Sequence, residues 1–146
     1  MVVHNAGIVR RGAVEATEVA DWDDVIATNL RAPYLLSRAL LPAMRRAGRG
    51  RMVFVASISS TIACPGNASY AASKWGVLGL HKSLAEELRG SGVSCFAILP
   101  GSVDTDMLVG SGFAPAMTPA DVARAITFLA LDAPEAMHGS ALEMFG

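Results

Sequence analysis

Met52-Val53-Phe54-Val55-Ala56 is a short, uninterrupted apolar run that is β-branched in part, and it leads directly into the hydroxyl-bearing Ser57. Such a run is typical of a strand that is buried on both faces of a parallel sheet. A second run of the same character, Val93 to Leu99, leads into Pro100-Gly101. Because open α/β sheets bind ligands beyond the carboxyl ends of their strands, the Ser57 hydroxyl is well placed to take part in a reaction.

Helical patterns separate these runs. Thr17 is predicted to cap a helix with a buried apolar stripe, and small and apolar residues recur at helical spacing from Ala68 to Leu88. Thr118-Pro119-Ala120-Asp121 combines a capping hydroxyl, a proline at the first helical position and an acid in the first turn, which predicts a further helix start. Strand and helix thus alternate, so we predict an α/β fold with a parallel sheet and helices on both faces. The stripe after Thr17 consists of Val19, Trp22, Val25, Ile26 and Leu30.

Tyr70-Ala71-Ala72-Ser73-Lys74 places a phenol and an amine one helical turn apart, within reach of one bound ligand. An ammonium group close to the phenol favours the phenolate, so Lys74 is predicted to lower the pKa of Tyr70 from its usual value of about 10. The pair is interpreted as a tuned proton-transfer group. The spacing taken alone has an alternative interpretation, in which the tyrosine ring is merely packed and the lysine amine is solvated.

Asn29 is followed four residues later by Pro33. Proline has no N–H, so the helical hydrogen bond from position 33 to the carbonyl of Asn29 cannot form, and we predict that the helix kinks there. The free carbonyl of Asn29 could hold a water molecule. The alternative is that the two residues only mark a helix break.

Six features, taken in order along the chain, resemble the short-chain dehydrogenase/reductase family, with the 3-oxoacyl carrier-protein reductase branch as the nearest in character. The resemblance implies a C-terminal half of a Rossmann-like, doubly wound parallel sheet, namely strands four to seven with flanking helices. Residues 1–146 would form a single partial domain, since the family's glycine-rich TGxxxGxG turn has no counterpart in the sequence. The six features are His4-Asn5-Ala6-Gly7, Asn29, Ser57, Tyr70, Lys74 and Pro100-Gly101-Ser102-Val103-Asp104-Thr105.

The resemblance also implies a catalytic set. Tyr70 would be the general acid/base, Ser57 would polarise a substrate carbonyl, and Lys74 would also bind the nicotinamide ribose. Asn29 would hold a water that links the lysine to solvent. A serine at a strand end that only caps a turn is the alternative for Ser57, because Ser59, Ser60 and Thr61 follow it closely.

The implied cofactor is NAD or NADP. Asn5, Ala6 and Gly7 would contact its adenosine side, while Tyr70 and Lys74 would face the nicotinamide half. By the same resemblance, Pro100 and Gly101 would let the backbone approach the nicotinamide, with Val103 and Thr105 against the carboxamide. His4 stands where the family more often has asparagine, and we assign it no role.

The function expected from these residues is hydride transfer between NAD(P) and a small-molecule carbonyl/alcohol substrate. The alternative is a truncated, catalytically silent module that acts only through subunit contacts, since the helices that bear Asn29 and Tyr70 commonly build an oligomer interface in the family. A homo-oligomer, dimer or tetramer, is expected in both cases. A chain that begins inside a strand is also expected to lack the upstream half of the sheet.

Composition and charge argue against several other classes of function. The net charge is −1, and the short arginine cluster from Arg45 to Arg51 is interpreted as a solvated helix end rather than a nucleic-acid patch. Cys64 and Cys95 have no CxxC or metal-ligand spacing, so no metal site or disulfide framework is predicted. The apolar runs are too short to span a bilayer and no signal peptide is recognisable, which predicts a cytoplasmic protein.

Overall fold

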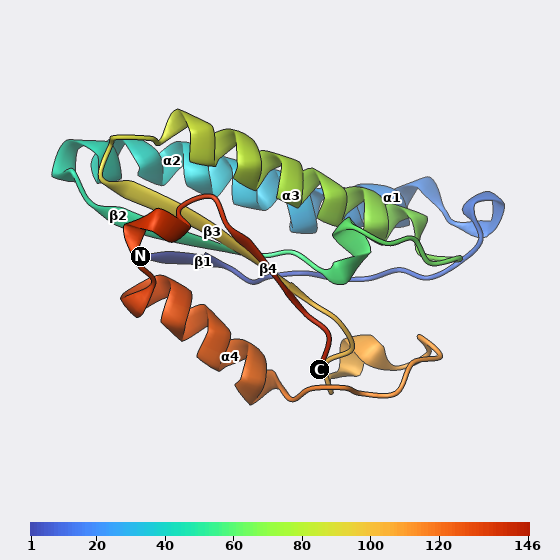
Figure 1. The fold of residues 1–146 in the computed structure, drawn as a ribbon. Helices are drawn as coiled ribbons and strands as arrows, with labels where there is room; N and C mark the ends of the chain where they lie inside the picture. The colour runs from blue at the N-terminus through green and yellow to red at the C-terminus, as the bar shows by residue number, and fades with distance from the viewer.

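The computed structural model describes all 146 residues, and its centre is a four-stranded sheet (Figure 1). All neighbouring strands are parallel, in the spatial order β1-β2-β3-β4, so the predicted parallel sheet is confirmed. No helix is both long enough and apolar enough to cross a membrane. The strands are β1 (Val2–His4), β2 (Gly50–Val55), β3 (Val93–Pro100) and β4 (Ala141–Met144).

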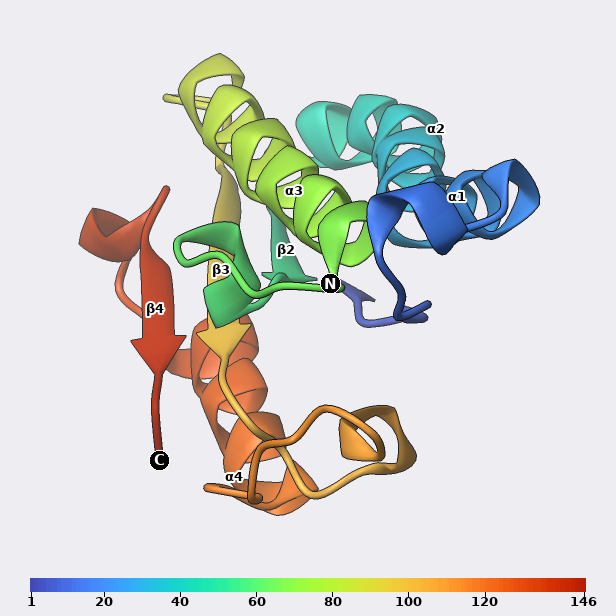
Figure 2. The same cartoon turned by 90° about the vertical axis from the view of Figure 1, so that its right-hand side faces the viewer.

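Three helices cover one face of the sheet, and one covers the other, as the two perpendicular views show (Figures 1 and 2). They are α1 (Val19–Ile26), α2 (Ala32–Ala47) and α3 (Ala68–Glu87) on the first face and α4 (Pro119–Thr127) on the second. Along β2, Met52 and Phe54 pack in the core beneath α3, whereas Val53 packs in the core beside α4. The uninterrupted apolar run therefore supplies both cores, because successive side chains point to opposite faces.

The two predicted helix starts have different outcomes. Thr118 forms a full capping box with Asp121, so this start is confirmed. Thr17 does not cap α1, since the position before the helix is Glu18 and the Thr17 hydroxyl donates to the Ala13 carbonyl at 2.9 Å. The helix begins one residue later than a Thr17 cap requires, so the N-cap position is held by Glu18, whose side chain makes no capping hydrogen bond.

The stripe predicted for α1 is only partly buried. Val25 is fully buried, but Val19 is 74% and Trp22 41% exposed. Helix α1 packs on its neighbours through the side that carries Val25, whereas the apolar side chains of Val19 and Trp22 remain exposed to solvent.

Gly92 allows the turn that leads into β3 to pass the end of α2. Its φ is +75°, and a Cβ there would overlap the carbonyl oxygen of Gly48. Gly92→Ala should therefore lower the free energy of unfolding by roughly 2–3 kcal/mol through left-handed strain and displacement of the backbone. Urea unfolding measures this loss. Gly90→Ala is the matched control, because its φ is also positive at +72° but nothing lies within 4 Å of the added carbon. Equal losses in the two variants would contradict the overlap argument.

His81 of α3 is fully buried beside Phe54, with their ring centroids 6.0 Å apart. Neither ring nitrogen has a hydrogen-bond partner. Burial lowers the pKa of His81 from 6.5 to about 4. The folded protein thus holds this imidazole neutral at pH values where the unfolded chain protonates it.

The stability of the protein should therefore fall in mild acid. Above pH 6.5 both states hold a neutral His81, and below that value only the unfolded state gains a proton until the pH reaches about 4. We expect a loss on the order of 3 kcal/mol across this window, measured by urea unfolding at a series of pH values. His81→Leu should flatten the profile in the same window. Parallel profiles for the two proteins would show that His81 does not carry the effect.

Candidate active site

The residues singled out in the sequence lie at or just beyond the carboxyl edge of the sheet. Asn5-Ala6-Gly7 follows β1, Ser57 follows β2, and Pro100-Gly101 closes β3. Because the strands are parallel, these ends meet at one edge, toward which the arrowheads point in Figure 2. The first turns of α3, which carry Tyr70 and Lys74, begin beside the same edge.

Asn29 connects three segments at this edge. Its side chain is buried, and its Oδ1 accepts a hydrogen bond from the N–H of Ile8 at 2.8 Å. Its Nδ2 donates to the carbonyl of Ile8 at 2.9 Å and to Oγ of Ser73 at 3.0 Å. Ser73 Oγ in turn donates to the Tyr70 carbonyl at 2.7 Å. Asn29 thus holds the loop after β1 against the first turns of α3.

At the position of the predicted kink, the structure has a π-helical turn, Ala27–Arg31, which contains Asn29 and joins α1 to α2. The N–H of Ala32 bonds to the carbonyl of Ala27. The helix therefore continues through a wider turn instead of breaking, as often happens where a helical hydrogen bond is lost. A water on the Asn29 carbonyl remains a prediction.

Gly76 lets α3 approach this π-helical turn. A Cβ at Gly76 would lie only 2.7 Å from Cδ2 of Leu30, so a larger residue would require the Leu30 side chain to shift. The absence of a side chain at Gly76 thus lets Leu30 of the π-helical turn pack closely on α3, within one turn of Ser73 and Lys74.

Lys74 is 4% exposed, and its Nζ donates to the carbonyl of Val55 at 2.9 Å. Burial lowers its pKa from 10.5 to about 8, so the amine is still mostly charged at pH 7. A Cβ placed on Gly7 would lie 3.5 Å from both Lys74 Nζ and Asn29 Oδ1, which brings these three residues together. An ammonium group has three N–H donors, and only one of them has a partner in the protein.

The predicted lowering of the Tyr70 pKa by Lys74 is wrong for the protein alone. The pKa of Tyr70 is raised, because burial of the phenol outweighs a side-chain hydrogen bond with Ser57 and the charge of Arg11, which both lower it. Lys74 Nζ lies 5.5 Å from the centroid of the Tyr70 ring. The ammonium group thus lies near the ring, but burial dominates the titration of its hydroxyl.

Ser57 is buried, and its Oγ has neighbours on both sides. Oγ accepts a hydrogen bond from the N–H of Ser59 at 3.1 Å and donates a long one to the carbonyl of Pro100 at 3.5 Å. Ser57 therefore does cap the short turn Ile58–Ser60, as the alternative interpretation held. Ser57 also lies near enough to Tyr70 to lower the pKa of that phenol, which places it beside the predicted proton donor.

Other predicted residues lie apart from this group. Asn5 and Ala6 are exposed, and Thr105 is exposed with its hydroxyl on the Val103 carbonyl at 3.4 Å. Val103 forms an isolated parallel bridge with Met117. These residues line the strand ends but form no side-chain hydrogen bond with Asn29 or Lys74.

Two residues of the site were missed in the sequence. Ser73 stands inside the Tyr70–Lys74 motif, and its place one residue before Lys74 was a usable signal. Arg11 reaches the carbonyls of Met107 and Val109, which lie 96 and 98 residues away along the chain. No local sequence pattern predicts a contact between residues so far apart in the chain.

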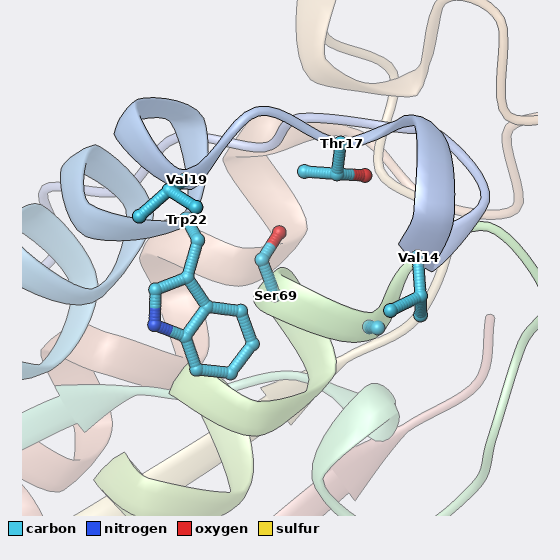
Figure 3. A pocket seen from close by; sticks show the side chains of 6 residues that line it. Val14, Thr17, Val19, Trp22 and Ser69 are labelled. Atoms are coloured by element: carbon cyan, nitrogen blue, oxygen red, sulfur yellow. The ribbon is translucent and has the colours of Figure 1, made fainter.

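A separate hollow of about 200 Å³ lies beside the N-terminus of α3 (Figure 3). It is mainly apolar, and Figure 3 shows Trp22 and Val19 from α1 on one side and Val14 on the other. None of the predicted site residues lines it. The hollow is lined by Val14, Thr17, Val19, Trp22, Ala68 and Ser69.

Comparison with known proteins gives consistent results. A family model for short chain dehydrogenases matches residues 1–112. The chain is 37% identical over 163 residues to 2-(R)-hydroxypropyl-CoM dehydrogenase of Xanthobacter autotrophicus. It is 33% identical over 159 residues to the 3-oxoacyl-[acyl-carrier-protein] reductase of Escherichia coli. Both matches cover 100% of this chain, which spans only 65% of the length of either relative.

The fold is shared with solved structures as well. A gluconate 5-dehydrogenase from Burkholderia cenocepacia, in complex with NADP and tartrate, superposes with a TM-score of 0.92 at 26% identity. The match covers 99% of this chain and 63% of that one. The predicted resemblance and the predicted partial Rossmann-like sheet are therefore confirmed.

Proposed function

The chain belongs to the short-chain dehydrogenase family, and we propose that it is the catalytic part of an NAD(P)-dependent oxidoreductase acting on a carbonyl/alcohol pair. Residues 1–146 then form one partial domain of that enzyme. The observation that carries the proposal is the convergence of Gly7, Asn29 and Lys74 beside Tyr70 and Ser57 at the ligand-binding edge of a parallel sheet.

The donor set at this edge suits a nicotinamide nucleotide. Lys74 has two free N–H donors, enough for the vicinal hydroxyls of a ribose, and Gly7 leaves the approach to them without a side chain. Asn5 and Ala6 are exposed on the same loop and would contact the adenosine side. Pro100, Gly101, Val103 and Thr105 follow β3, on the side proposed for the carboxamide. The relative from Burkholderia cenocepacia binds NADP, and we propose NAD or NADP here.

Tyr70 would exchange the proton. A bound nicotinamide supplies or accepts the hydride. In the reducing direction the Tyr70 hydroxyl donates its proton to the carbonyl oxygen, and in the oxidising direction the phenolate takes that proton from the alcohol. Ser57 would donate a hydrogen bond to the same oxygen and stabilise the negative charge that develops there.

Lys74 and Asn29 would support this proton transfer. Lys74 Nζ lies 5.5 Å from the centroid of the Tyr70 ring, and we propose that its positive charge would stabilise the phenolate that forms when Tyr70 gives up its proton. Asn29 holds the hydroxyl of Ser73, which donates a hydrogen bond to the backbone carbonyl of Tyr70. These two hydrogen bonds would fix the backbone from which the Tyr70 side chain extends. A water held by the backbone carbonyl of Asn29 would return the proton to solvent.

Fluorescence titration of the purified chain with NADH and NADPH tests the proposal. We expect saturable binding, weakened about 10–100-fold by Lys74→Ala, because a charge-assisted hydrogen bond is lost. Lys82→Ala is the matched control, since Lys82 lies on the same helix and donates to the Gly139 carbonyl at 2.8 Å, away from the site. A folded chain that binds neither nucleotide would contradict the proposal and favour the catalytically silent alternative.

We further propose that the protein is a homo-oligomer. Four apolar side chains of α2 and one of α3 are at least 36% exposed, which is costly for a free surface. Sedimentation velocity should show a dimer or tetramer, and a compact monomer at all concentrations would refute this state. The five side chains are Tyr34, Leu35, Leu36, Leu40 and Trp75.

A further inference from the structure

Arg11 joins the loop after β1 to the segment after β3. Its Nη2 donates to the carbonyl of Met107 at 2.8 Å, and its Nη1 donates to the carbonyl of Val109 at 3.2 Å. Both acceptors belong to the short helical turn Asp106–Leu108 and the residue that follows it. One guanidinium group therefore binds two carbonyl groups of a single turn.

The loop that carries Arg11 is itself anchored on the other side. The N–H of Gly12 donates to the carbonyl of Gly66 at 3.0 Å, in the stretch that leads into α3 and Tyr70. The loop is thus fixed between the start of the helix that bears the proposed proton donor and the segment after β3. Arg11 also lies close enough to Tyr70 for its charge to lower the pKa of that phenol.

The neighbouring arginine is used differently. Arg10 pairs with Asp21 of α1 at 3.1 Å and makes no contact with the segment after β3. Arg11 has no acidic partner. The only hydrogen bonds of its side chain are the two to the carbonyl groups of Met107 and Val109, so the Arg11 side chain connects the loop after β1 to the segment after β3.

The segment that Arg11 holds has little else to fix it. Gly110 and Gly112 have φ values of +74° and +80°, and a Cβ at either would meet nothing within 4 Å. Val109 and Phe113 are 75% and 60% exposed. The backbone hydrogen bonds of the turn are local, and Arg11 supplies its long-range hydrogen bonds.

We propose that Arg11 is a positioning residue, which fixes Met107–Val109 as the outer wall of the substrate site beside Tyr70. This inference rests on the proposed function. A carbonyl substrate that enters next to Tyr70 then meets a wall of fixed position, built from the apolar side chains of Met107 and Val109. Without the guanidinium fork, the wall would move away from the loop after β1 and hold the substrate less well.

Hydrogen exchange of the purified chain tests the wall without any need for activity. The N–H groups of Leu108, Val109 and Ser111 are bonded within the turn, so their exchange reports its opening. Arg11→Gln should speed that exchange about fivefold, as expected for the loss of two exposed hydrogen bonds. Arg10→Gln should leave it unchanged. Equal exchange in Arg11→Gln and the unaltered chain, or equal acceleration in both variants, would overturn the proposal.

Steady-state kinetics then separates positioning from general damage. Arg11→Gln should raise KM for a carbonyl substrate about fivefold, while NADH or NADPH binds as tightly as before, because the wall contacts only the substrate. A fall in nucleotide affinity, or a loss confined to kcat, would count against a wall. If neither nucleotide binds to the unaltered chain, the proposed function fails, and the exchange experiment still decides whether Arg11 fixes the turn.

Discussion

Replacing Tyr70 by phenylalanine is expected to lower turnover of a carbonyl substrate by about 10²–10⁴-fold, the usual contribution of a positioned general acid. The change removes one hydroxyl and keeps the ring that packs at the N-terminal end of α3. Folding and nucleotide binding should therefore persist. The measurement is the rate at which the absorbance of NADH or NADPH decreases, with a carbonyl compound found by screening.

Tyr34→Phe provides the matched control for this variant. Tyr34 is the second tyrosine of the chain, lies on α2 and is 50% exposed. Its loss should leave turnover within about twofold, since no reacting group lies near a solvated ring. If Tyr70→Phe kept a tenth or more of the turnover, another group would have to deliver the proton.

The sheet could be predicted from the sequence because its signals are local. The run Met52 to Ala56 is apolar at every position, as a strand between two helix layers requires, and Thr118 with Asp121 forms the capping box that its spacing indicates. The loss of a helical hydrogen bond near Asn29 could also be predicted, because a proline removes it whatever the surroundings, although the prediction was a kink and the structure has a π-helical turn. In each case the physical cause lies within a few residues.

The site was predicted less completely, because its properties depend on residues far apart in the chain. The pKa of Tyr70 depends on its burial and on Ser57 and Arg11, which an argument from Lys74 alone could not include. The contacts of Arg11 cross almost 100 residues. Thr17 does not cap α1 because the helix begins one residue later, with Glu18 at the N-cap position. Spacing along the chain identifies which residues can meet, whereas packing decides what each contact does.

Asn29→Ala should be the most destabilising of the substitutions considered, with a loss of roughly 4 kcal/mol in the free energy of unfolding. The variant would leave the part-buried N–H and carbonyl of Ile8 without a partner, at a cost of about 1–3 kcal/mol each. The Ser73 hydroxyl would lose one hydrogen bond but keep its bond to the Tyr70 carbonyl. Urea unfolding measures the loss. Nucleotide binding should weaken in the same variant, because the loop with Gly7 would no longer be held against α3.

Asn67→Ala distinguishes this network from the general cost of removing an asparagine. Asn67 precedes α3, but its side chain does not cap the helix and its Oδ1 is buried without a partner. Removal of an unpaired buried oxygen should cost less than about 1 kcal/mol and could stabilise the fold. A loss in Asn67→Ala as large as that in Asn29→Ala would mean that the three hydrogen bonds of Asn29 do not hold the site together. A difference of several kcal/mol would show that one amide side chain stabilises the junction of the β1 loop, the π-helical turn and α3, on which the positions of Ser73 and Lys74 depend.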